Sequence, residues 1–285
     1  DLKRPQGVEE VLELVDGADA LVEGYRPGVA ERLGIGPEVC MRRNPRLVYG
    51  RITGWGQSGP LAHAAGHDIN YVALSGALHA IGPSDGKPVV PLNLVGDYGG
   101  GSLYLALGIV SAILQARSTG KGQVVDAAIV DGAASLMTTF FGRMAAGQWH
   151  DERGVNMLDG GLPWYDIYRT ADSKFVAIGA LEPQFFEVLC TKLGLDKAYL
   201  VTRDDPATWP ALRADLERIF ESNSREYWCS LLEGTDACFA PVLSMSEAAV
   251  HPHNVARQTF IKRDGVVQPS GAPRFGASSD CAIML

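Results

Sequence analysis

The sequence predicts an α/β fold built on a parallel sheet, followed by a smaller region that mixes strands with helices. Two short apolar runs, residues 18–23 and 47–52, have the length of buried strands. Short helices lie between them, broken by Pro27-Gly28 and by a glycine-rich turn at residues 34–37. This strand–helix–strand order is typical of a parallel sheet. With 285 residues, of which 46% are hydrophobic, the chain can bury one large core or two smaller ones.

The first half contains further elements in regular order. Residues 8–15 have helical spacing of apolar residues, with acidic residues on the opposite face. A loop rich in glycine, residues 53–60, leads to a second helical pattern that begins near Ile69. The other elements expected here are a long helix at residues 102–117, a strand at 124–129 and a helix at 133–146.

The second half begins with two strands, at residues 165–170 and 175–181, around a short turn. Glu182 and Pro183 then begin a helix, because proline suits the first helical position. The remaining elements expected are helices at residues 209–220 and 225–232 and an extended piece at 240–242, with mostly coil from Pro252 onward.

Composition excludes several classes of protein. The net charge of −8 gives no overall basic field to attract nucleic acid or an anionic membrane. We find no apolar run of the ~18 residues that suggest a membrane span. The five cysteines are odd in number and lack C-x-x-C spacing, so we expect reduced thiols, no metal site and a cytoplasmic protein. They are Cys40, Cys190, Cys229, Cys238 and Cys281.

The beginning of the sequence is unusual for an α/β domain. It starts at Asp1 and soon enters a helix, whereas such a domain normally starts with a strand. We therefore expect a fragment that lacks at least one βαβ unit of ~30 residues. Any targeting signal would then lie in the missing part.

A histidine and an aspartate are expected at the starts of two helices. Asp97 lies where an extended segment should turn into a helix, and the glycines at 99–101 let backbone approach a ligand closely. His67 lies just before the helical pattern at Ile69. Such a pair suits proton transfer by two bases. Taken singly, His67 could be an ordinary polar residue, Asp97 a helix cap, and Glu182 an acid in a helix dipole.

Several separate segments strengthen the two-base interpretation. They are Gly66–Tyr71, Pro91–Asp97 with its glycines, Gly120–Ala127, Asn156–Gly161 and Glu182–Phe185, together with Asp1–Lys3 and Tyr25–Gly28. In these segments the chain resembles the α-methylacyl-CoA racemases, members of the family III CoA-transferase superfamily. The resemblance covers nearly the whole chain.

The resemblance implies a role for individual residues. His67 and Asp97 match the two catalytic bases, and Glu182 matches a glutamate that supports the histidine. The residues implied in binding the CoA thioester are Leu2, Lys3, Tyr25, Arg26, Arg32, Gly66, Asp68, Ile69, Asn70 and Tyr71.

The resemblance also implies an architecture: a Rossmann-like CoA-binding domain, a smaller α+β domain, and two subunits interlocked as a homodimer with active sites between them. We therefore divide the chain into an N-terminally incomplete CoA-binding domain at residues 1–130, a connector at 131–164, a small domain at 165–255 and a return segment at 256–285. The family's first strand and helix have no counterpart here, and residues 276–285 match no part of the family.

The implied activity is interconversion of (R)- and (S)-2-methylacyl-CoA thioesters by two-base proton transfer through an enolate, with no metal or redox cofactor. A family III CoA transferase, with Asp97 as nucleophile, is the nearest alternative. A non-catalytic acyl-CoA-binding fragment and an NAD-dependent oxidoreductase are the others, the latter resting on the glycines alone. Met144 and the connector segment 157–161 suggest an adaptable apolar wall for the acyl group, whose identity stays open.

Overall fold

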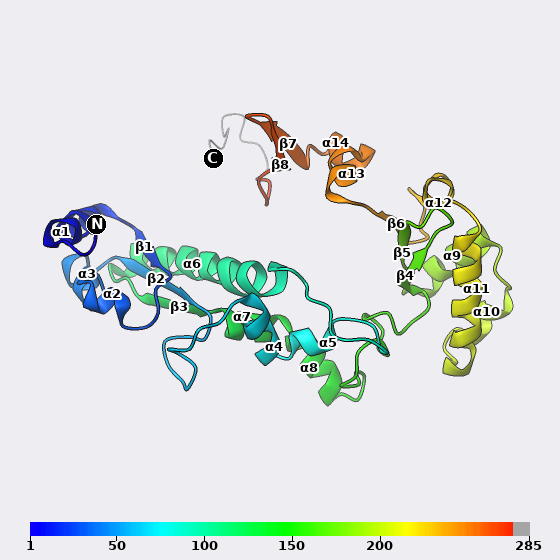
Figure 1. Cartoon of the computed structure of the whole chain (residues 1–285), viewed down its shortest axis with the longest axis horizontal. Helices are drawn as coiled ribbons and strands as arrows, with labels where there is room; N and C mark the ends of the chain where they lie inside the picture. The colour runs from blue at the N-terminus through cyan, green and yellow to red at the C-terminus, as the bar shows by residue number, and fades with distance from the viewer. Residues whose placement is uncertain (276–285) are drawn as a thin grey trace. The chain divides into compact units, whose positions relative to one another are not determined.

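The computed structural model describes residues 1–275, which form two compact units. The first unit is Asp1–Tyr165, and the second begins at Asp166. Figure 1 labels the helices and strands of both units in chain order. The C-terminal Cys281 lies outside the described residues.

A parallel sheet of three strands forms the centre of the first unit. The strands β1 (Ala20–Glu23), β2 (Val48–Thr53) and β3 (Val124–Ala128) lie side by side in that order. Both neighbouring pairs are parallel, and Glu23 lies opposite Arg51. The predicted parallel sheet is therefore confirmed.

Three helices from the N-terminal part of the chain pack near the start of β2. They are α1 (Pro5–Gly17), α2 (Val29–Arg32) and α3 (Pro37–Arg43), which confirms the helix expected at residues 8–15. Their apolar faces share one buried cluster with the start of β2. The cluster consists of Leu12, Val15, Ala30, Ile35, Cys40, Leu47 and Tyr49.

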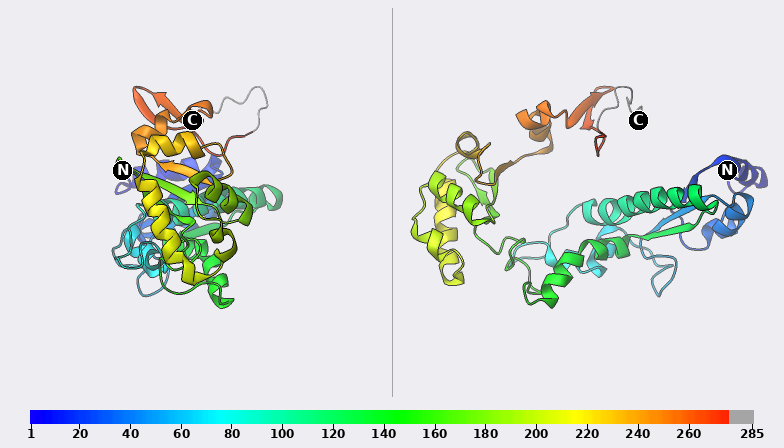
Figure 2. Two further views of the ribbon diagram at one scale, coloured as in Figure 1. Left: turned by 90° about the vertical axis from the view of Figure 1, so that its right-hand side faces the viewer. Right: turned by 180° about the vertical axis from the view of Figure 1, so that it is seen from behind.

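A long helix runs beside the sheet. It consists of a π-helical part, η1 (Leu94–Ser102), followed directly by α6 (Leu103–Thr119). Figures 1 and 2 both show α6 alongside β2 and β3, where it buries Ala112 and Ala116. Its other face exposes an apolar stripe of Leu103, Leu107, Val110 and Leu114.

The length and composition of this helix would allow it to cross a membrane. Among the described residues one helix, Leu94–Thr119, passes that test, with a mean hydropathy of 1.4. Our expectation that no apolar segment is long enough fails by this measure. The helix contacts β2, β3 and α7, but only 28% of its most apolar 18-residue stretch is buried.

Four shorter helices complete the first unit. They are α4 (Asp68–Leu74), α5 (Ala77–Ala80), α7 (Ile129–Leu136) and α8 (Thr138–Ala145). The single helix expected at residues 133–146 starts earlier and is divided at Met137, whose backbone N–H bonds to Ala134 at the end of α7. Residues 146–164 contain turns but neither helix nor strand.

The second unit has its own sheet and core. Strands β4 (Tyr165–Arg169), β5 (Phe175–Gly179) and β6 (Phe239–Val242) lie in that order, with β5 and β6 antiparallel. The packed helices are α9 (Pro183–Leu193), α10 (Ala198–Thr202), α11 (Trp209–Glu221) and α12 (Arg225–Leu232), with a short 3₁₀ turn, η2 (Pro206–Thr208). The expected strands and the helices at 209–220 and 225–232 are confirmed; α10 was not expected.

We expected mostly coil from Pro252 onward, but in residues 252–275, the part that the structure describes, a helix and a hairpin are present. After α13 (Met245–Val250), the chain forms α14 (Pro252–Ala256) and a hairpin of β7 (Phe260–Arg263) and β8 (Val266–Pro269). Asp264 and Gly265 both have positive φ at the tip of the hairpin, as a two-residue type I′ turn requires. This Asp-Gly pair was a readable hairpin signal.

Candidate active site

His67 occupies the N-cap position of α4. Its backbone is extended, with φ −133° and ψ 172°, and its backbone N–H donates to Asn70 Oδ1 at 3.0 Å. This bond satisfies one of the N–H groups that a helix start leaves unpaired. The His67 side chain is exposed, so its ring is open to a ligand. The position expected for His67, directly before a helix, is confirmed.

Asp97 does not lie at the boundary between an extended segment and a helix. The helical segment η1 already begins at Leu94, with Asn93 as its N-cap, so Asp97 lies at the end of the first turn. The Asn93 side chain donates to Asp97 Oδ2 at 2.7 Å. The expected boundary was therefore about one turn too late.

The glycines after Asp97 bring two helices together. A Cβ on Gly100 would lie only 2.5 Å from the backbone nitrogen of Ala133 in α7. A Cβ on Gly132 would lie 1.7 Å from the carbonyl oxygen of Gly100. The glycine run thus permits contact between η1 and α7, whereas we had expected it to face a ligand.

Asp68 connects the two candidate bases. Its carboxylate Oδ1 accepts the backbone N–H of Asp97 at 2.7 Å, and the residue is only 5% exposed. A Cβ on Gly96 would lie 2.2 Å from this same oxygen, so glycine is needed beside Asp97. Because Asp68 directly follows His67, the backbone of one candidate base is tied to the chain neighbour of the other.

A cavity of about 260 Å³ opens beside His67. Its walls come from the loop after β1, the glycine-rich loop after β2 and the start of α4. The lining residues are Gly24, Tyr25, Arg26, Pro27, Thr53, Gly54, Trp55, Ala62, Ala64, Ala65, Gly66, His67 and Tyr71. This wall brings together five residues that the sequence analysis assigned to the CoA thioester or to catalysis: Tyr25, Arg26, Gly66, His67 and Tyr71.

Tyr71 is the buried polar group of this wall. Its hydroxyl donates to the carbonyl oxygen of Gly66, and its ring meets that of Trp55 edge-on, with centroids 4.7 Å apart. Burial raises the pKa of the Tyr71 hydroxyl, the charge of Asp97 raises it further, and Arg26 opposes both. Tyr71 is therefore a neutral hydroxyl at neutral pH, within electrostatic reach of both Asp97 and Arg26.

The other predicted binding residues lie outside this wall. Ile69 and Asn70 are exposed on α4, and the Asp68 side chain is engaged with Asp97. Leu2 packs against the core of α1 to α3. Lys3 is exposed near the N-terminus, and Arg32 lies at the end of α2.

Glu182 belongs to the second unit. It is exposed at the N-cap of α9, directly before Pro183, so the predicted helix start is confirmed. Its backbone carbonyl accepts the N–H groups of Phe185 and Phe186.

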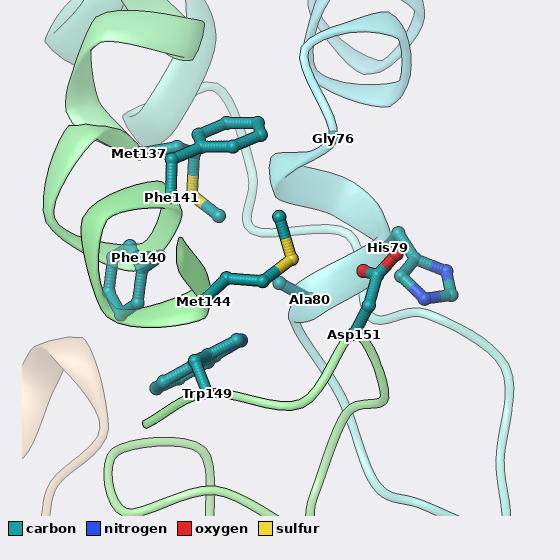
Figure 3. Close-up of a pocket in the computed structure, with 9 residues that line it drawn as sticks. All are labelled: Gly76, His79, Ala80, Met137, Phe140, Phe141, Met144, Trp149 and Asp151. Atoms are coloured by element: carbon teal, nitrogen blue, oxygen red, sulfur yellow. The ribbon is translucent and has the colours of Figure 1, made fainter. Parts of the chain in front are cut away.

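Two apolar cavities of about 300 and 380 Å³ lie on the α5 and α8 side of the first unit. They share Ala80, Met137, Phe140 and Trp149. Figure 3 shows the side chains of Met137, Phe141, Met144 and Trp149 around the first cavity, with His79 and Asp151 at one edge. The second cavity adds Val95 of η1 and Leu158. Met144 was expected in an apolar wall.

Several residues near the site were missed from the sequence. Asn93 could have been found, because it lies four residues before Asp97 and such pairs meet on a helix. Trp55 and the aromatic residues of α8 carry no local signal, because the fold alone brings them to a cavity. Within residues 1–275, no group of three or more His, Cys, Asp or Glu side chains could hold a metal ion.

Comparison with known proteins identifies the family to which the chain is similar. The profile of CoA-transferase family III matches residues 1–280, so our expectation that residues 276–285 match no part of the family is wrong for 276–280. The α-methylacyl-CoA racemases of mouse and human are both 45% identical to the chain, over 96% of its length and 71% and 72% of theirs. An acetyl-CoA:oxalate CoA-transferase of Acetobacter aceti is 32% identical, over 94% of this chain and 70% of its own.

The solved structures show the same fold. A CaiB/BaiF family protein from Brucella suis superposes with a TM-score of 0.81 and 26% identity, covering 98% of this chain and 74% of that protein. The mixed α/β architecture expected from the sequence is thus confirmed.

Proposed function

Because the chain belongs to CoA-transferase family III, we propose that it interconverts (R)- and (S)-2-methylacyl-CoA thioesters by removing and replacing the proton on the α-carbon. Its sequence identity of 45% with the two mammalian racemases supports an isomerase. The structural observation that supports this reaction most is the bond from the Asp97 N–H to Asp68, the residue after His67. This hydrogen bond fixes the position of the Asp97 backbone relative to the start of α4, where His67 lies.

The reaction needs two groups on opposite faces of the α-carbon. One takes the proton as a general base while the other returns one as a general acid, and the roles exchange with the hand of the substrate. Neutral His67 takes the proton and protonated Asp97 returns one for one enantiomer, and the reverse pair serves the other. The enolate oxygen needs donors as its negative charge develops, and backbone N–H groups of η1 or α4 are suitable.

The cavity beside His67 suits the CoA part of the substrate, since Arg26 there supplies a positive charge for phosphate. The two apolar cavities beside α5 and α8, of which Figure 3 shows the first, suit the acyl part. Met137 and Met144 are flexible side chains that adapt to several acyl shapes. We propose that the thioester then binds close to His67, which lines the cavity that suits CoA.

The reaction as proposed needs no metal or redox cofactor, because acid–base groups suffice. We further propose an interlocked homodimer with Glu182 supporting His67, as the resemblance implies, and a location in the cytoplasm, as the scattered cysteines suggest. Light scattering combined with activity assays tests the dimer: full activity in a monomer would contradict it.

A CoA transferase is the second candidate, supported by the identity with the oxalate CoA-transferase of Acetobacter aceti. There Asp97 would attack the thioester carbonyl, form an acyl anhydride and release CoA. A transferase gives His67 no role as a base and requires a second carboxylic acid as acceptor.

Incubation of one enantiomer of a 2-methylacyl-CoA in deuterated water separates the two candidates. We expect α-deuterium incorporation together with loss of optical purity, with no acceptor acid present. Exchange of acyl groups that begins only after a free carboxylic acid is added would assign the protein to the transferases.

A further inference from the structure

An ionic cluster, buried at Arg51 and Glu23 and partly exposed at Glu31, lies next to the loop that forms one wall of the His67 cavity. At its centre is Arg51 of β2, whose side chain is 7% exposed. Its Nε donates to Glu23 Oε1 at 2.7 Å, and the Glu23 side chain is 3% exposed. Its Nη1 and Nη2 donate to the two oxygens of Glu31 at 2.8 and 3.3 Å. All three nitrogens of the guanidinium are therefore engaged.

The two acidic partners stand at opposite ends of one loop. Glu23 is the last residue of β1, and Glu31 lies in α2. Between them, residues 24–28 contain Tyr25, Arg26 and Pro27, which line the cavity with His67. Arg51 thus holds both ends of a five-residue loop from a single position in the neighbouring strand.

The cluster also fixes the backbone inside the loop. Glu23 Oε2 accepts the backbone N–H of Tyr25 at 2.7 Å. The loop ends at Gly28, which has a φ of +79° and leads into α2. The carboxylate of Glu23 therefore links Arg51 directly to the residue before Arg26.

Burying the pair of Arg51 and Glu23 costs free energy that well-packed apolar side chains of the same volume would avoid. A charged cluster does, however, fix a geometry, because a planar guanidinium accepts only particular positions of its carboxylates. The loop that benefits carries Arg26, the cation of the cavity wall.

We propose that Arg51, acting through Glu23 and Glu31, is a positioning residue that holds loop 24–28 so that Arg26 and Tyr25 are ready to bind the CoA portion of the substrate. This inference rests on the proposed function, which supplies the CoA ligand. It predicts that the cluster affects binding of CoA and leaves the chemical step alone.

A matched pair of variants tests this role. Replacement of Arg51 by an apolar residue would leave Glu23 buried without its cation and could unfold the protein. Glu31→Ala avoids this risk, because the Glu31 side chain is 44% exposed. The control is Asp16→Ala: Asp16 is 50% exposed and accepts two bonds from Arg43, at 2.7 and 2.9 Å, away from the cavity.

The measurements are the Kd of free CoA by titration calorimetry and the KM and kcat for a 2-methylacyl-CoA. For Glu31→Ala we expect Kd and KM to rise about tenfold with kcat unchanged, as for loss of a charge-assisted pair that orders a binding loop. Asp16→Ala should match the unmodified protein. Arg51→Lys keeps the positive charge but loses the planar guanidinium that bonds both glutamates, so its Kd should lie between those of the unmodified protein and Glu31→Ala.

Three results would overturn the proposal. They are an unchanged Kd in Glu31→Ala, an equal rise in Kd in both alanine variants, or a fall in kcat with Kd unchanged. If the unmodified protein does not bind CoA at all, the proposed function fails and this inference fails with it. If the unmodified protein binds CoA and racemises its thioester, an unchanged Kd in Glu31→Ala removes this inference alone.

Discussion

At the scale of single residues, His67 and Asp68 divide two tasks between neighbouring positions. The His67 side chain is exposed and open to substrate, whereas that of Asp68 is buried and holds the backbone of Asp97. His67 is the N-cap of α4, and Asp68 is the first residue of the helix. The proposed acid and base therefore depend on a third residue that does no proton transfer.

The two proposed bases should separate by stereochemistry. His67→Ala should abolish deuterium exchange that starts from one enantiomer, and Asp97→Ala should abolish exchange from the other. Both variants should lose net racemisation, by ~10²–10⁴-fold, as is usual when a general base is removed. The measurement is α-deuterium incorporation from each pure enantiomer. Normal α-deuterium exchange from both enantiomers in a folded Asp97→Asn protein would contradict the two-base mechanism.

Asp68 should behave as a positioning residue for Asp97. In Asp68→Ala the Asp97 N–H loses its acceptor, so we expect a loss of about 1–3 kcal/mol in unfolding free energy and a lower kcat. Asp68→Asn keeps an acceptor oxygen and should retain more of both. Denaturant unfolding and kcat at a temperature where both variants are folded provide the check. An unchanged kcat in Asp68→Ala would show that this bond does not position Asp97.

At the scale of elements, the contact between η1 and α7 depends on paired glycines. Gly132→Ala would place a Cβ 1.7 Å from the Gly100 carbonyl oxygen, so the helices must separate. We expect a loss of about 1–3 kcal/mol in stability, the usual effect of overpacking, and reduced activity because η1 carries Asp97. Thermal unfolding and kcat measure the two effects.

The control for this prediction is Gly142→Ala in α8. A Cβ on Gly142 would meet nothing within 4 Å, so the change should stabilise the helix by up to about 1 kcal/mol through propensity. Equal destabilisation by the two substitutions would mean that the close approach at Gly132 is not what matters.

Much of the element order could be predicted from the sequence, because local patterns carry it. The parallel sheet followed from two apolar runs separated by short helices, and the starts of α4 and α9 followed from the residues before them. His67 and Asp97 were proposed as the catalytic pair by resemblance and from their expected positions at helix starts, which the structure confirms for His67 and corrects for Asp97. Local signals were sufficient wherever a helix or strand lay within one stretch of chain.

The remaining features are set by tertiary contacts that no local pattern encodes. We expected the glycines at 99–101 to face a ligand before a helix at residues 102–117, yet they belong to η1 and pack against α7. The bond from Asp97 to Asp68 joins residues 29 positions apart. The cluster of Glu23, Glu31 and Arg51 likewise joins two strands and a helix.

At the scale of the whole molecule, acidity and stability are connected through paired carboxylates. The chain carries a net charge of −8 at neutral pH, so acidification first lowers its overall repulsion. The same acidification removes carboxylates that accept hydrogen bonds from cations. Which effect dominates depends on how far the pKa of each carboxylate is lowered in the folded state.

Glu247 in the second unit is the clearest case. Arg225 donates to both of its oxygens, at 2.5 and 3.2 Å, while also donating to the Val242 carbonyl, so the pair joins α13 to α12 and β6. Hydrogen bonds from Arg225, from the Ser244 N–H and from Lys174 hold the pKa of Glu247 well below its usual range. The lowered pKa means that the ionised form is stabilised by folding.

The sign of the pH effect follows from this direction. A carboxylate with a lowered pKa contributes stability above its unfolded pKa of about 4.3, and that contribution is lost as the pH falls towards the folded pKa. Glu247→Gln should therefore lower the melting temperature at pH 7, and its difference from the unmodified protein should shrink below about pH 4.3. Melting curves between pH 7 and 3 measure this, with Glu221→Gln at the exposed end of α11 as control. A difference that stays constant down to pH 3 would mean that Glu247 contributes through packing and not through its charge.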